Sequence, residues 1–223
     1  MVTLANGLSD MSKELGETTT NTSVRRVEHY GDAIIEFFNA RKWPFAIKKD
    51  NTSLSTLANT LIYAIPAGIL ADMRQPGGIK EIYIGSETTP YLGIDFELRN
   101  DSVYTDGKYF YIDPETTTIT FLKTLGAAGQ AMTIHYYFIP ARVTDTTTGT
   151  YPLPDRYRKI VATLAAAFVQ WGRYLEGQGN RLYNVYTRML DGVIDQQTEP
   201  GTSQPKVLQH PLTYKGFRRI YRR

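Results

Sequence analysis

Apolar residues at helical spacing predict two helices in the first 44 residues. Between residues 3 and 15 they recur every three or four positions and line one face of a short helix, which Gly16 and a threonine-rich run bring to an end. A second helix is predicted from about Ser23. It ends before Trp43-Pro44, because a residue that precedes proline is disfavoured in the α region. The apolar faces comprise Leu4, Leu8, Met11, Leu15, Val24, Val27, Ile34 and Phe38.

From Phe45 to about residue 150 the pattern changes to short runs of β-branched and aromatic residues between turn residues, which predicts strands. Asp106-Gly107 favours a type I′ turn and predicts a hairpin between residues 102–105 and 108–112. Residues 92–98 alternate like a strand, but a short helix before Asn100 is nearly as plausible, and both readings stay open. The clearest strand runs are residues 61–66, 79–84 and 132–139.

Helical spacing returns after Pro152-Leu153-Pro154-Asp155, where an early proline and an acid at the positive end of the helix dipole favour a helix start. This third helix has no charge between Lys159 and Arg173, so we expect the rest of the fold or a second subunit to cover it on more than one side. Residues 177–180 predict a turn, and a fourth helix follows from about Arg181. The expected core or subunit-interface residues are Leu164, Phe168 and Trp171.

Together these segments predict an α+β fold with a C-terminal arm. Residues 1–44 and 152–197 are expected to form a four-helix bundle from two N-terminal helices and a C-terminal helical hairpin, with residues 45–151 as an inserted β-rich domain. Residues 198–223 are a linker followed by an extended arm in which bulky and basic residues alternate. The bulky residues are Val207, Leu208, Leu212, Tyr214, Phe217, Ile220 and Tyr221, and the basic ones are Lys206, Lys215, Arg218, Arg219, Arg222 and Arg223.

Charge is concentrated in this arm. The chain has 223 residues and a net charge of +3, and no acid follows Glu199, so removing the six bases of the arm leaves −3 for the preceding residues. The slightly negative net charge of the residues before the arm argues against a broad nucleic-acid-binding face. The absence of cysteine excludes disulfides. No secretion signal or membrane span is predicted, and we expect a soluble protein made in a reducing cytoplasm.

Residues that carry enzyme chemistry form no recognisable pattern. The three histidines lie far apart and outside a His-Glu-x-x-His motif, and no Gly-x-Ser-x-Gly motif is present. Asp95 and Glu97 would share a strand face and are the only candidate acid and base, although two solvated carboxylates explain them better. We therefore expect no catalytic residues, no bound metal and no cofactor.

Three short segments resemble one family. They are Asn39-Ala40-Arg41-Lys42-Trp43-Pro44-Phe45, the run from Leu61-Ile62-Tyr63-Ala64-Ile65-Pro66 to Ile69, and Leu153-Pro154-Asp155-Arg156-Tyr157 before the third helix. This order resembles the head-to-tail adaptor (connector, or head-completion) proteins of tailed bacteriophages, in which a helix that ends in Trp-Pro leads into a strand and a Tyr-x-Leu-Pro-like segment. Here Ile65 replaces the usual leucine, and Ala67-Gly68-Ile69 replaces the common acid and aromatic residues.

The resemblance implies a virion protein of the head-tail neck, made in the host cytoplasm. Its protomers would form a twelvefold ring that binds the portal protein, joins it to a tail or nozzle protein and continues the channel through which DNA passes. The arm's bulky residues would then bind the portal, and its basic residues would face the channel or DNA. The alternative is a nucleic-acid-binding module, with the arm's arginines on phosphates and its aromatic rings on bases.

We predict that the arm is dispensable for folding, because the helical and strand patterns are complete before Thr198. Truncation at residue 197 should leave the melting temperature nearly unchanged and abolish stable attachment to the portal. Differential scanning calorimetry and portal pull-down measure the two effects. A truncated chain that no longer folds would contradict the prediction.

Overall fold

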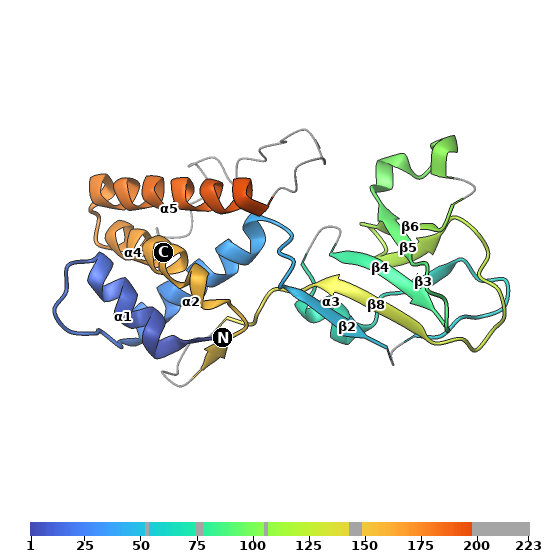
Figure 1. Cartoon of the computed structure of the whole chain (residues 1–223), viewed down its shortest axis with the longest axis horizontal. Helices are drawn as coiled ribbons and strands as arrows, with labels where there is room; N and C mark the ends of the chain where they lie inside the picture. The colour runs from blue at the N-terminus through green and yellow to red at the C-terminus, as the bar shows by residue number, and fades with distance from the viewer. Residues whose placement is uncertain (52–53, 75–77, 105–106, 143–148, 198–223) are drawn as a thin grey trace. The chain divides into compact units, whose positions relative to one another are not determined.

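The computed structural model describes residues 1–51, 54–74, 78–104, 107–142 and 149–197, with the side chains of residues 194–197 left out. The chain is α+β and divides into two compact units. Residues 1–41, together with the described residues that follow Ala141, form what we call the helical unit. The described part of residues 42–141 forms the sheet unit (Figure 1).

The helical unit contains four helices from the two ends of the chain. Its elements are β1 (Val2–Thr3), α1 (Leu4–Glu14), α2 (Val24–Ala40), β9 (Thr150–Tyr151), the 3-10 turn η3 (Asp155–Tyr157), α4 (Arg158–Gly172) and α5 (Glu176–Gln197). The Thr3 hydroxyl accepts a hydrogen bond from the Asn6 amide and caps α1. The predicted first, second and third helices are confirmed, including the end of α2 just before Trp43-Pro44.

Helix α4 lies at the centre of this unit. It packs against α1, α2 and α5 (Figure 1), and every residue from 160 to 170 is buried. A helix that is apolar on all sides is stable only when other elements cover each side. Helices α1, α2 and α5 of the same chain therefore bury the uncharged stretch of the third predicted helix.

Two glycines set the distance between helices. A Cβ atom at Gly7 of α1 would overlap the ring of Tyr30 on α2, and one at Gly179 of α5 would overlap the indole of Trp171 on α4. The predicted turn at residues 177–180 is wrong for this reason. Gly179 lies inside α5, where it lets the helix approach Trp171, and the actual turn comes earlier, at residues 173–175.

The sheet unit is one curled seven-stranded sheet with the order β2-β8-β4-β5-β6-β7-β3 (Figure 1). All neighbouring strands are antiparallel except β5 and β6, which are parallel. The strands are β2 (Ile47–Asp50), β3 (Ile62–Ala64), β4 (Ile79–Ile84), β5 (Tyr91–Ile94), β6 (Tyr109–Asp113), β7 (Thr118–Phe121) and β8 (Met132–Tyr137). The three predicted strand runs correspond to β3, β4 and β8.

One face of this sheet forms the unit's core. Burial alternates along the strands, as in β8, where Met132, Ile134 and Tyr136 are buried and the residues between them are half-exposed. Alternation of this kind is typical of an antiparallel sheet with one solvated face. Helix α3 (Ala67–Asp72), which the sequence pattern did not predict, follows Pro66 and buries Ile69.

The predicted hairpin around Asp106-Gly107 is wrong in its first strand. Residues 102–104 form the 3-10 turn η2 (Ser102–Tyr104), whose start is fixed by a hydrogen bond from the Val103 amide to the Asp101 carboxylate (3.0 Å). Strand β6 pairs with β5 and β7 instead. The turn residues 105 and 106 lie outside the described residues. Residues 92–98 combine both open readings, because β5 ends at Ile94 and the 3-10 turn η1 (Phe96–Leu98) follows.

The last described residues of the expected β-rich insertion, from Arg142 onward, belong to the helical unit. Strand β9 pairs with β1, with Val2 opposite Tyr151, and the Leu4 amide donates to the Gly149 carbonyl (2.8 Å). Arg142 also forms an ion pair with Asp32 of α2 (2.7 Å). The chain thus returns to the helical unit at Arg142, ten residues before the proline-rich motif that we took as the boundary.

We predict that the α4 side chains are essential for stability. Phe168 is 3% exposed, so Phe168→Ala should lower the free energy of unfolding by about 3–5 kcal/mol through loss of apolar contact and a residual cavity. Urea denaturation followed by circular dichroism measures the change. Val185→Ala on α5 is the control, because Val185 is 39% exposed and should change stability by no more than about 0.5 kcal/mol. Equal losses in the two variants would contradict the prediction.

Candidate functional site

The site residues expected from the sequence fall into two groups. The arm residues from Lys206 to Arg223 lie outside the described residues. In α4, Leu164 and Phe168 are buried, and Trp171 is half-buried, with its indole N–H donating to Asn180 Oδ1 of α5 (3.0 Å). These side chains pack within a single chain.

The candidate acid and base do not form a reactive pair. Asp95 precedes η1 and Glu97 lies within it, so the expectation that they share a strand face is wrong. Both residues are exposed. In the part of the chain that the structure describes, no group of three or more acidic, histidine or cysteine side chains could hold a metal ion. No helix in that part is long and apolar enough to cross a membrane.

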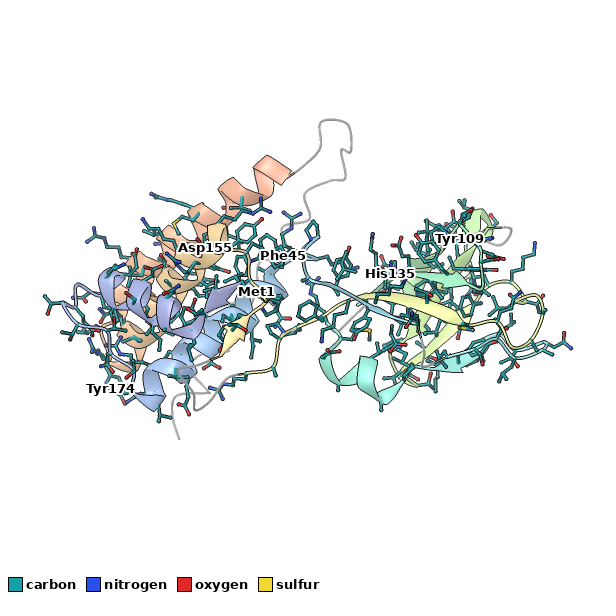
Figure 2. The ribbon with its side chains drawn as sticks, turned by 60° about the horizontal axis from the view of Figure 1, so that its bottom comes forward. Met1, Phe45, Tyr109, His135, Asp155 and Tyr174 are labelled. Carbon is teal, nitrogen blue, oxygen red and sulfur yellow. The ribbon has the colours of Figure 1, made fainter. Side chains whose placement is uncertain are left out.

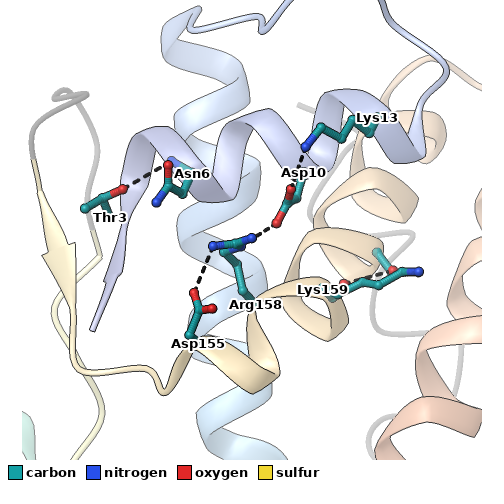
Figure 3. A network of polar contacts seen from close by, with 8 residues as sticks. Thr3, Asn6, Asp10, Lys13, Asp155, Arg158 and Lys159 are labelled. Atoms are coloured by element: carbon teal, nitrogen blue, oxygen red, sulfur yellow. Dashed lines mark hydrogen bonds and ion pairs between the residues drawn. The ribbon is translucent and has the colours of Figure 1, made fainter.

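A polar network joins the two ends of the chain (Figure 3). Arg158 at the start of α4 binds Asp10 of α1 and also Asp155 of η3, the latter at 2.8 Å, and Lys13 binds Asp10 at 3.2 Å. The open pocket beside this network is lined by three acids and three bases: Asp10, Glu14, Asp155, Lys13, Arg158 and Lys159. The network links α1 to α4. Because the three acids balance the three bases, the pocket offers no net charge to a ligand.

A second polar cluster lies on the solvated face of the sheet. His135 Nδ1 of β8 lies 2.9 Å from Glu81 Oε1 of β4, the ring centroid of Tyr83 is 5.2 Å from that of His135, and Lys80 also binds Glu81. Burial alone would raise the pKa of Glu81, but hydrogen bonds with His135 and Lys80 outweigh it and lower that pKa. Glu81 lies opposite His135 in the pairing of β4 with β8, so these contacts form a cross-strand pair.

The far end of α4 carries an exposed surface that we call the α4 end patch, made of Val24, Arg25, Arg173, Tyr174 and Leu175. It forms where the start of α2 meets the end of α4, because Arg25 Nη2 donates to the Gly172 carbonyl (3.4 Å). Beneath it, Glu17 binds buried Arg26 and also Arg173, the latter at 3.3 Å. This ion pairing fixes the loop before α2 to the end of α4.

Tyr174 is the most unusual residue of the α4 end patch. Its φ of 62° lies in the left-handed region, where a helix usually ends with glycine. The amides of Tyr174 and Leu175 bond back to the carbonyls of Trp171 (3.0 Å) and Gln170 (2.9 Å), which closes the helix end. The ring itself is 89% exposed at one end of the helical unit (Figure 2). An aromatic side chain is thus held in solvent by a strained backbone.

The sheet unit has an exposed surface of opposite charge, which we call the acidic ridge. It comprises residues 95–104, with Asp95, Glu97 and Asp101 as acids and Leu98 and Val103 as exposed apolar side chains. Aromatic contacts hold it on the solvated face of β6: the ring centroids of Phe96 and Tyr111 are 5.6 Å apart, and those of Tyr104 and Tyr109 are 5.0 Å apart. Arg99 stacks over Phe96 (3.9 Å) and donates to its carbonyl (2.9 Å).

Comparison with known proteins identifies the family. The model of the SU10 adaptor protein family matches residues 8–209. The chain belongs to this family of phage head-to-tail adaptors. No curated protein matches the chain. The match covers both units and agrees with the resemblance seen in the Trp-Pro and Leu-Pro-Asp segments. The family supports a structural adaptor role for this chain.

Sequence reasoning missed the two exposed surfaces for different reasons. Nothing in the pattern marks Tyr174 as exposed, because an aromatic residue between the third and fourth helices is compatible with a buried position. The acidic ridge carried a signal, since three acids occur within residues 95–101, but the strand reading of residues 92–98 placed two of them on one strand face. In both places the signal that matters is the fraction of the side chain that solvent reaches, which requires the tertiary fold.

We predict that the backbone of Tyr174 is strained and that glycine relieves the strain. Tyr174→Gly should be more stable than Tyr174→Ala by about 1 kcal/mol, because both variants remove the ring but only glycine adopts a φ of 62° without cost. Thermal unfolding at neutral pH compares them. If the two variants melt at the same temperature, the left-handed conformation carries no strain.

Proposed function

We propose that this chain is the structural head-to-tail adaptor of a tailed phage. Its copies assemble as a ring, twelvefold by the resemblance described above, that binds the portal through the C-terminal arm. The same ring joins the portal to a tail or nozzle protein and continues the DNA channel. The protein is then part of the virion neck, and its partners are other copies of itself, the portal, the tail or nozzle protein and the DNA that passes through.

The observation that carries this proposal is the family match over residues 8–209. It includes the helical unit, the sheet unit and the first residues of the arm, so the proposal does not depend on a single shared domain. The contacts within the helical unit give additional support. Because α1, α2 and α5 all cover α4 within one chain, the four helices can serve as a preformed bundle that assembles without unfolding.

The chemistry of the described residues supports a structural role. Two of the polar groups that lie together are paired within the chain: Asp10 and Asp155 with Lys13 and Arg158, and Glu81 with Lys80. A catalytic site needs a nucleophile or base aimed at a substrate position. The surfaces that remain open to a partner are apolar and charged patches, which suit protein contacts.

Electron microscopy of the purified protein mixed with its cognate portal tests the proposal. Negative-stain images should show rings of the adaptor on one face of the portal. Free portal rings beside unassembled adaptor, at concentrations well above those in an infected cell, would overturn it.

We predict that the arm binds the portal through its bulky residues. Replacing Tyr214, Phe217 and Tyr221 by alanine should raise the dissociation constant for portal by at least about 100-fold, because buried aromatic residues dominate interface energies. Replacing Arg218, Arg219, Arg222 and Arg223 should raise it by about tenfold at most, since exposed ion pairs contribute little each. Biolayer interferometry measures both.

The salt dependence of binding identifies the alternative. If the arm is a nucleic-acid clamp, four phosphate contacts give a slope of roughly −3 to −4 for the logarithm of DNA affinity against that of salt concentration. The arginine variant would then flatten that slope. Tight DNA binding with this slope and no binding to portal would contradict the adaptor function.

A further inference from the structure

Two groups of exposed apolar side chains in the described part of the chain lie beside charged residues. At the α4 end patch, Val24, Tyr174 and Leu175 are 55%, 89% and 43% exposed. On the acidic ridge, Leu98 and Val103 are 38% and 74% exposed. Apolar side chains that stay in water near one another on a folded protein are candidate contact sites for other molecules. Each patch is therefore a candidate half of an interface.

The two patches carry opposite charges. Arg25 and Arg173 at the α4 end patch are exposed, while Arg26 is buried and paired with Glu17, so the patch stays positive by one charge after Glu176 beside it is counted. On the acidic ridge, three acids face the single base Arg99, whose guanidinium is stacked on Phe96. Neither Glu97 nor Asp101 forms an ion pair with another described residue. The patches are thus complementary in charge and alike in apolar content.

We propose that the α4 end patch of one copy docks on the acidic ridge of the next copy in the assembly. The proposal rests on the ring-forming function above and names the surfaces that would form it. Because the two surfaces differ, the contact is heterologous, and repetition of one heterologous contact closes a ring when the rotation between copies fits. A self-complementary contact would give only a dimer.

The composition of the patches suits this contact. Tyrosine and arginine are enriched among the residues that dominate interface energies, and both occupy the α4 end patch. Hydrogen bonds of the helix end already fix the backbone of Tyr174, so little backbone entropy is lost when the residue binds a partner. The ridge is fixed by the ring contacts of Phe96 and Tyr104 and offers Leu98 and Val103 beside its acids. Both surfaces are present before assembly.

Disulfide trapping tests the contact directly, because the natural chain has no cysteine. One preparation carries Tyr174→Cys, and a second, enlarged by a mass tag, carries Val103→Cys. The two are mixed in equal amounts with oxidised glutathione and analysed on a non-reducing gel. The tag separates the mixed dimer from the two possible homodimers. The matched control replaces the first variant with Val185→Cys, which is also exposed on the helical unit but lies outside the α4 end patch.

The mixed dimer of Tyr174→Cys and Val103→Cys should form at least about tenfold faster than the control dimer, because docking raises the effective concentration of the two thiols. Adding Glu97→Lys to the Val103→Cys chain should slow it at least about threefold at low salt, through loss of charge complementarity. Rates equal to the control, or a predominance of homodimers, would overturn the proposal.

A separate measurement distinguishes this contact from the adaptor function itself. Wild-type protein is imaged with portal under the same conditions. If rings form on portal but the disulfide between residues 174 and 103 does not, the adaptor function stands and the proposed contact between these two surfaces is wrong. The disulfide without rings on portal would support the contact between copies and reject the proposed function.

Discussion

The structure of the helical unit depends on one constraint, which is that no side of α4 faces solvent between residues 160 and 170. Residues 160–170 are all buried, so water cannot replace any of the helices around them. Two of those helices, α1 and α2, come from the start of the chain and one, α5, from its end. The burial of α4 therefore requires residues more than 100 positions apart in sequence to fold together, with the sheet unit inserted between them.

Small residues make that burial possible. Alanines 162, 165, 166 and 167 keep the surface of α4 narrow, and Gly7 and Gly179 admit the rings of Tyr30 and Trp171 between neighbouring helices. Polar links then fix the orientation of the helices, with Arg158 joining α1 to α4 at one end and Glu17 joining Arg26 to Arg173 at the other. The apolar contacts supply most of the stability, because partly exposed ion pairs contribute little. The ion pairs instead determine which ends of the helices meet.

The sequence predicts the elements of this fold better than their partners. Helices α1, α2 and α4 and strands β3, β4 and β8 follow from local periodicity, because each has one clear repeat of apolar residues. Gly177 to Asn180 were misread as a turn because glycine serves a close helix contact at Gly179, which no local rule reveals. The pairing of β5 with β6, or of β1 with β9, depends on contacts between distant residues. The family could be recognised from short motifs around Trp43-Pro44 and Leu153-Pro154, whereas the exposure of Tyr174 and Val103 required the folded chain.

The hydrogen bond between the Phe138 amide and the Ala46 carbonyl, 3.0 Å long, brings the first and last strands of the sheet unit side by side. Closing a long flexible loop costs chain entropy, and contacts across such a loop slow folding. Once β2 and β8 have paired, however, the insertion no longer behaves as a loop of nearly a hundred residues but as a short connection between α2 and η3. A sheet unit that folds first therefore removes most of the entropic barrier to assembling the helices.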